Sequence, residues 1–466
     1  MTFLLLFLPM LLLMYFIRGG IRWRNAVLVA ASLVFYAWGE PVFVLGMLFS
    51  TAVNYLCARV IDASGTSVRR KAALVLGIGV SLGFLFYFKY YAFVLENISS
   101  LFSLQYHVPE IRLPIGISFY TFQVLTYTVD VYRGKAPVQR SFWKLLLYVS
   151  CFPQLIAGPI VQYADVASQL DERSTSVEDF TGGMRRFIAG LSKKVLLANV
   201  CGAALSALPQ GTGGEAMSFV GAWYLTILYS LQLYFDFSAY SDMAIGLGRI
   251  LGFRYKENFN YPYVSLSATE FWRRWHISLG SFFRDYVYIP LGGNRRGAMR
   301  TGLNILIVWT LTGLWHGAAW NFILWGFYFG VILLLERSVL KKLLEKLPTA
   351  LRWALTALVV TTGWAIFYHT DAAALGTALR AMFGIGAAGL TDPVTMQVMR
   401  RYSFFPLIAF VFSLPAGPAA AGWLRRRKNG ERVFPVLRDA AAAGALFLSM
   451  VFLVGQSYNP FIYFRF

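Results

Sequence analysis

Long runs of apolar residues recur throughout this 466-residue chain, and they constrain its fold more than any other feature. In one stretch, residues 301–335, no Asp, Glu, Lys or Arg occurs. Charged residues make up only 14% of the chain, against about a quarter in soluble domains, and a soluble domain could not bury so much apolar surface. An outer-membrane barrel would instead show short segments of alternating polarity. We therefore expect an all-α, polytopic integral membrane protein.

The apolar runs define a set of candidate membrane spans: 2–17, 25–39, 42–60, 72–95, 114–132, 142–162, 183–207, 218–234, 237–252, 303–315, 318–336, 352–369, 404–422 and 440–455. Some are shorter than the roughly 20 residues that a full crossing needs, which favours half-helices or re-entrant segments buried within the protein. The sequence contains no internal repeat and no Pro- or Ser-rich linker. We therefore expect a single membrane-embedded domain over residues 1–466.

Basic residues give the chain a net charge of +20, and they gather in short loops between the apolar runs. This distribution is typical of cytoplasmic loops, which also contact anionic lipid head groups. We interpret it as membrane orientation and not as nucleic-acid binding. The first apolar run precedes the basic residues at 18–24, and the last one follows those at 425–428. Both termini are therefore expected on the extracytoplasmic side.

The central stretch, residues 234–326, differs from its flanks. Between positions 236 and 293 it combines Asp, Ser, Asn, Glu, His and Arg with aromatic residues, and Pro262 and Pro290 interrupt any regular helix there. Polar, broken segments are tolerated at membrane depth only where they are buried in protein or line a watery cavity. The stretch therefore predicts an intramembrane chamber that is reached from the cytoplasm.

Two histidines in this stretch, His276 and His316, are the candidate catalytic residues, because an ionisable side chain at membrane depth is a functional-site hypothesis by default. A neutral imidazole can accept a proton from an attacking hydroxyl, and His316 stands in the uncharged stretch described above. The alternative is that His316 only packs and hydrogen-bonds across two helices. His276 follows Arg273 and Arg274, so it could orient the substrate or the other histidine, or be an ordinary interfacial histidine.

Three arginines near His276 are candidate donor-binding residues. Arg273, Arg274 and Arg284 could hold the phosphates of a donor through charge-assisted hydrogen bonds, although anchoring at a cytoplasmic surface explains them equally well. The acidic residues of the stretch are too few and too widely spaced for a metal site, and none is expected. No HExxH, GxSxG or phosphate-binding glycine motif accompanies them, so the sequence does not support a soluble-type hydrolase or a nucleotide-driven motor.

Two motifs carry a family resemblance. FWRRWHISL at 271–279, together with LWHGAAWNFILWG at 314–326, resembles the two-histidine signature of the membrane-bound O-acyltransferases (MBOAT). Segments 114–134, 151–170 and 234–253 extend the resemblance over nearly the whole chain. The sequence is similar to the bacterial branch that acetylates alginate and peptidoglycan, and more distantly to D-alanyl exporters of teichoic acids.

This resemblance implies a fold, a reaction and a location. The fold would be an MBOAT-type helical core with broken or re-entrant helices around a central tunnel. His316 matches the essential histidine and His276 the second polar position. The family implies acetyl-CoA or another acyl thioester as a donor made in the cytoplasm, with no permanently bound cofactor. An esterase-like extracytoplasmic acetyltransferase would be the partner that completes O-acetylation of a polysaccharide or peptidoglycan outside the bacterial cytoplasmic membrane.

The C-terminal sequence QSYNPFIYFRF suggests an acceptor on the far side. The phenol of Tyr463 could serve as a transient acyl carrier, and the motif is similar to the aromatic C-terminal sequence used for acyl relay in related teichoic-acid systems. The alternative is an aromatic belt that anchors the protein at the membrane surface. Two other functions stay open, D-alanyl transfer to teichoic acid and a non-catalytic transporter or flippase.

Overall fold

The computed structural model describes residues 2–104, 106, 108–454 and 461, and the regular structure in this part of the chain is entirely helical. The prediction of an all-α protein is confirmed. The chain divides into two compact units, one of residues 1–187 and 241–256 and the other of residues 188–240 and 257–466. The division falls within two helices, α10 (Val177–Ser192) and α12 (Phe219–Ile250). The earlier prediction of one membrane domain is not decided by this grouping and stays a prediction.

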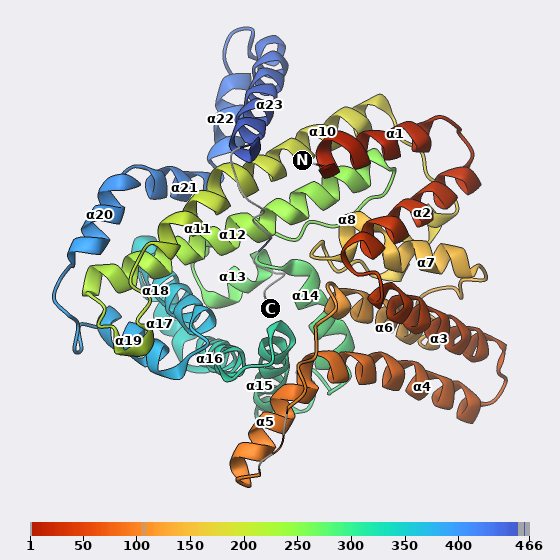
Figure 1. The fold of residues 1–466 in the computed structure, drawn as a ribbon, viewed down its shortest axis with the longest axis horizontal. Helices are drawn as coiled ribbons and strands as arrows, with labels where there is room; N and C mark the ends of the chain where they lie inside the picture. Colours follow the sequence, from red (N-terminus) through yellow and green to blue (C-terminus); the bar gives the residue numbers. More distant parts are fainter. Residues whose placement is uncertain (1, 105, 107, 455–460, 462–466) are drawn as a thin grey trace. The chain divides into compact units, whose positions relative to one another are not determined.

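The first unit is formed mainly by the N-terminal helices (Figure 1). Their bounds are α1 Leu8–Phe16, α2 Ile21–Gly39, α3 Phe43–Ala63, α4 Ser67–Leu85, α5 Tyr91–Leu101, α6 Ile117–Tyr132, α7 Phe142–Ser150, α8 Phe152–Leu155 and α9 Tyr163–Val166. Helices α3, α4 and α6 pack against one another. Asn54 of α3 joins them, because it donates to Ser81 of α4 at 2.8 Å and accepts from Thr128 of α6 at 2.7 Å. A buried amide is tolerated here because its hydrogen bonds are made within the protein.

The second unit holds both candidate histidines. Its helices are α11 Asn199–Ser206, α13 Ala268–Arg274, α14 Ile277–Phe283, α15 Gly297–His316, α16 Trp320–Leu335, α17 Lys341–Lys346, α18 Thr349–Tyr368, α19 Ala372–Met382, α20 Pro393–Arg401, α21 Phe405–Ser413, α22 Ala416–Arg425 and α23 Gly430–Val454. The core around α15, α16 and α18 is aromatic, with Trp325, Phe329 and Trp364 almost fully buried. Helix α15 lies beside α16, and α16 also packs against α18 (Figure 1).

Asp392 caps α20 in a part of the unit that lies outside the candidate membrane spans. Its carboxylate accepts hydrogen bonds from the backbone N–H and the hydroxyl of Thr395 and from the hydroxyl of Ser218. Burial alone would raise the pKa of Asp392, but these hydrogen bonds outweigh it and hold the pKa below its ordinary value. The ionised carboxylate therefore stabilises this helix start.

Six helices of the described part of the chain are long and apolar enough to cross a membrane, or seven if the bent pair α21 and α22 forms one span. This supports a multi-pass protein. Four expected spans differ from the structure. Segments 218–234 and 237–252 are one continuous helix, α12, because the polar residues between them do not break a helix. Segment 142–162 is interrupted before Pro153, and segment 404–422 is bent by 70° between α21 and α22.

Candidate active site

A tight helical hairpin positions His316, which is the last residue of α15. Helix α16 begins at Trp320, only four residues later. The two helices meet at glycines: a Cβ atom on Gly313 would come within 3.0 Å of the carbonyl oxygen of Phe322, and one on Gly326 would come equally close to that of Trp309. Small residues allow two helix backbones to touch in this way. The hairpin therefore holds the His316 backbone against α16.

The imidazole of His316 is enclosed by aromatic rings. Its side chain is buried, and its ring lies edge to face with Trp325 of α16 and with Phe367 of α18, both at 5.2 Å between ring centres. Asn321 links the same two helices, because its amide donates to the backbone carbonyl of Phe367 at 2.9 Å. The ring thus lies among aromatic side chains, and a neutral imidazole can accept a proton from a hydroxyl group that reaches it.

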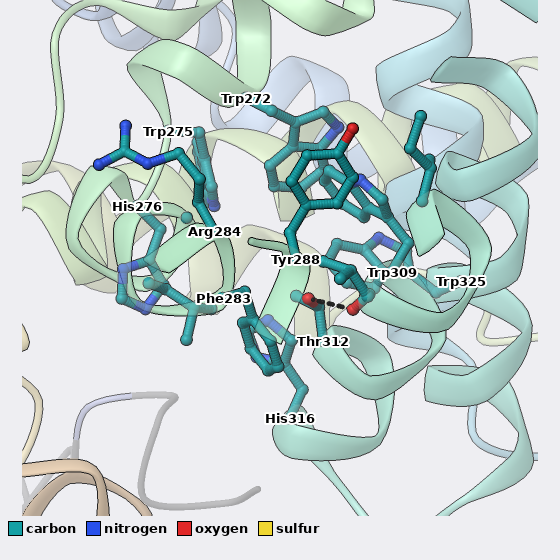
Figure 2. A pocket seen from close by; sticks show the side chains of 14 residues that line it. Trp272, Trp275, His276, Phe283, Arg284, Tyr288, Trp309, Thr312, His316 and Trp325 are labelled. Carbon is teal, nitrogen blue, oxygen red and sulfur yellow. Dashed lines mark hydrogen bonds between the residues drawn. The ribbon is translucent and has the colours of Figure 1, made fainter. Parts of the chain in front are cut away.

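A cavity of about 250 Å³ runs along the face of α15 that ends at His316. Helix α15 contributes a stripe of side chains with helical spacing: Ile305, Val308, Trp309, Thr312 and His316. At 1.5 Å per residue, the distance along the helix from the first to the last of these is about 16 Å. The remaining lining comes mostly from aromatic residues: Trp272, Trp275, His276, Leu279, Gly280, Phe283, Arg284, Tyr288 and Trp325. Figure 2 shows the hydroxyl of Tyr288 and the guanidinium of Arg284 away from His316.

His276 lies at the junction of α13 and α14 and lines the same cavity. Its backbone is left-handed, with φ of 45°, which is unusual for a residue with a side chain. Asn258 supports this conformation, because its backbone carbonyl accepts from the N–H of Ile277 at 3.0 Å and its side-chain oxygen accepts from the N–H of Ser278 at 3.2 Å. Strained backbone of this kind is maintained only by such surrounding contacts, and it gathers at functional sites.

The side-chain amide of Asn258 also determines the tautomer of His276. The backbone N–H of Ser278 can only donate, so the Asn258 atom that faces it is the oxygen, and that oxygen also lies 3.2 Å from Nδ1 of His276. Nδ1 therefore carries the proton and Nε2 carries the lone pair. Nε2 is buried and makes no hydrogen bond within the described residues. Nε2 is therefore an unused acceptor on a residue that lines the cavity.

The three candidate arginines are not gathered in one place. Arg284 lines the cavity, and its guanidinium forms a two-point ion pair with Asp285 at 2.8 and 3.1 Å. Arg274 pairs with Glu270 at 2.9 Å, and Arg273 is exposed on α13. Of the three, Arg284 alone lines the cavity. Their role in binding a donor stays a prediction.

The sequence of the chain is similar to those of a known protein family. Residues 135–372, which include both histidines, match the model of the MBOAT, membrane-bound O-acyltransferase family. The chain belongs to this family. It is 38% identical to a probable alginate O-acetylase AlgI of Pseudomonas aeruginosa, over all of this chain and 99% of that protein. It is 39% identical to AlgI of Pseudomonas putida over the same shares, and 33% identical to a peptidoglycan O-acetyltransferase of Helicobacter pylori over 83% of this chain and 80% of that one. The protein is therefore a membrane-bound O-acyltransferase.

Some residues of this candidate site were indicated by the sequence and others were not. His276 and His316 line one cavity, as expected for a common site. The sequence did not predict that Asn258 contacts His276, that Trp325 packs on His316 or that Thr312 lines the cavity. Asn258 stands 18 positions before the histidine that it contacts, and Trp325 is one of 13 tryptophans, so neither gives a local signal. Only the helical spacing of Thr312 relative to His316 could have indicated that they share a face. Tyr463 lies outside the described residues.

Proposed function

We propose that this MBOAT protein takes an acetyl group from a cytoplasmic thioester, acetyl-CoA, and passes it across the bacterial cytoplasmic membrane for O-acetylation of an extracytoplasmic polysaccharide or peptidoglycan. The observation that carries the proposal is His316 in a cavity of about 250 Å³, walled mostly by aromatic residues and lined by α15 over about 16 Å of the helix. The names of the relatives, alginate O-acetylase and peptidoglycan O-acetyltransferase, support an acetyl group over D-alanine.

His316 is the general base in this proposal. It takes the proton of the acceptor hydroxyl as the oxygen attacks the thioester carbonyl. The tetrahedral intermediate then collapses, the carbon–sulfur bond breaks, and the thiolate receives the proton from the imidazolium, so the histidine returns to its neutral form. His276 offers a lone pair on Nε2, which suits an N–H group of the donor arm and would orient it.

The charges near the cavity support a donor that enters from the cytoplasmic side. Acetyl-CoA carries phosphates that cannot enter hydrocarbon, and a cavity beside Arg284 would let its arm reach His316 while the phosphates stay outside. The basic loops, including Arg295, Arg296 and Arg300 just before and at the start of α15, favour the same side by the positive-inside rule. This orientation places both termini outside.

The acceptor is the second half of the proposal. Tyr463 would accept the acetyl group as a phenyl ester and pass it to an esterase-like acetyltransferase outside the membrane. That partner would transfer the group to the polymer.

The test uses the full-length protein in proteoliposomes with radiolabelled acetyl-CoA. His316→Gln should abolish release of free coenzyme A thiol, and His276→Gln should raise KM for acetyl-CoA more than it lowers kcat. His369→Gln is the matched control, because His369 is also buried but does not line the cavity. Normal thiol release by His316→Gln would refute the base assignment. Mass spectrometry of the C-terminal peptide tests the relay, since label should appear on Tyr463 and vanish in Tyr463→Phe.

The same assay separates the other functions. A D-alanyl transferase would consume a D-alanyl carrier-protein thioester and ignore acetyl-CoA. A transporter would move substrate without thiol release, and His316→Gln would then leave thioester consumption unaffected.

A further inference from the structure

A second recess in the same unit is separate from the His316 cavity. It measures about 520 Å³ and lies among α12, the turn Pro262–Val264, α18 and α21. None of its lining residues lines the His316 cavity. Its size falls within the range of sites that hold a sizeable organic ligand.

The recess has a buried floor and an open rim. Phe271, Leu231 and Val360 form part of the floor and are at most 3% exposed. Ile227 and Leu358, at 42% and 38%, are among the lining residues that remain accessible. The space is therefore open on one side and is not filled by the protein's own side chains.

The lining indicates the chemistry of the occupant. Five polar side chains of the recess each donate a hydrogen bond to a backbone carbonyl, at 2.7–2.9 Å: Ser230, Tyr263, Ser265, Trp353 and Thr356. Their donors are thus already used within the protein, and the rest of the surface is almost entirely apolar. A polar ligand would lose its hydrogen bonds to water here without replacement, whereas a hydrocarbon chain would not.

The surroundings indicate where that hydrocarbon comes from. Helix α18 is long and apolar enough to span a membrane, and so is the bent pair α21 and α22, so the open side of the recess adjoins lipid. Trp353, in the lining, lies four residues after the start of α18, about 6 Å along the helix. The segment leading to that start, residues 336–348, has four basic residues and two acidic ones.

Arg352 directly precedes Trp353 in the first turn of α18, but it is not itself one of the residues that line the recess. Its Nε is buried and makes no hydrogen bond within the described part of the chain. The carboxylate of Glu270 is close enough to Arg352 to attract its positive charge. This carboxylate is already ion-paired with Arg274 at 2.9 Å. A phosphate placed here would gain a charge-assisted bond to Arg352 and attraction from the basic segment.

We propose that the recess holds one acyl chain of an anionic glycerophospholipid, with its phosphate beside Arg352 and the start of α18. The chain fills a space that would otherwise be a void against α18. Because α18 also carries Phe367, which packs on His316, the bound lipid supports the wall of the catalytic cavity. This proposal does not depend on the identity of the acyl donor or acceptor.

The test measures lipid retention by the full-length protein in detergent, after lipid removal and incubation with phosphatidylglycerol or phosphatidylcholine. We expect the native protein to keep a single phosphatidylglycerol and to gain thermal stability from it. Ala357→Phe, which places a ring in the recess, should lose that lipid and the gain. Leu355→Phe is the control, because Leu355 stands on the same helix outside the lining. Arg352→Gln should remove the preference for the anionic lipid.

Each other outcome overturns part or all of the proposal. Retention of phosphatidylglycerol by Ala357→Phe would place the lipid elsewhere, and equal retention of the two lipids by the native protein would refute the phosphate contact. Loss of lipid in Leu355→Phe as well would mean that the effect is not specific to the recess. Thiol release from acetyl-CoA, measured separately, tests the catalytic proposal and does not bear on this one.

Discussion

The contact between α15 and α16 offers the sharpest test of how the fold serves the site. A methyl group on Gly313 would lie within 3.0 Å of the carbonyl oxygen of Phe322, closer than real Cβ atoms come. The neighbouring atom belongs to the backbone and cannot swing away, so the two helices must separate. We expect Gly313→Ala to destabilise the protein by about 1–3 kcal/mol, the usual cost of overpacking a tight interior.

The same substitution should also lower activity. His316 lies three residues after Gly313 on the same helix, so any separation of the helices moves its imidazole relative to Trp325 and the cavity. A shift on the order of 1 Å at a catalytic group can cost roughly 100-fold in rate. Thermal unfolding in detergent measures the first quantity, and kcat for thiol release in proteoliposomes measures the second.

Gly302 provides the matched control, because it stands on the same helix and faces the same partner. A Cβ on Gly302 would lie 3.5 Å from a methyl carbon of Leu334, an ordinary contact. Gly302→Ala should therefore be neutral or gain up to about 1 kcal/mol from helix propensity, with normal turnover. The reasoning is refuted if Gly313→Ala behaves like Gly302→Ala in both measurements.

Three further changes probe the supports of the site. Asn258→Leu leaves Nδ1 of His276 and the backbone N–H of Ser278 without their acceptor, which should lower stability in thermal unfolding by about 1–3 kcal/mol. The same variant should raise KM for acetyl-CoA, and an unchanged KM would contradict the orienting role of His276. The carboxylate of Glu336 accepts two backbone N–H bonds at the start of α13, so Glu336→Gln should lower stability by about 1.5–3 kcal/mol, while the exposed Glu345→Gln should not. Asp392→Ala should cost about 1 kcal/mol at neutral pH as a lost helix cap. Because the folded pKa of Asp392 is lowered, its contribution is complete above about pH 4, the ordinary aspartate value, and is lost as the pH falls through the folded pKa; a gap between native and variant that stays constant in acid would refute this.

The polar positions of the central stretch show where sequence reasoning was limited. Segments 218–234 and 237–252 were expected to be separate spans, yet α12 continues through both and through Asp236 between them. Asp236 is buried and ion-paired with Lys194, so the helix tolerates its charge. Such a partner, 42 residues away, is not visible in the local pattern.

The sequence by itself determined the membrane class, the helical fold and the family, and it indicated the two histidines as candidates, because apolar runs and short motifs are local properties of the chain. Only the tertiary structure decided that Asn258 holds one histidine in a single tautomer and that Trp325 and Phe367 enclose the other. It also decided that a separate apolar recess opens beside α18. These features depend on which side chains from distant segments meet, and the distances between them are set by packing and not by any one stretch of residues.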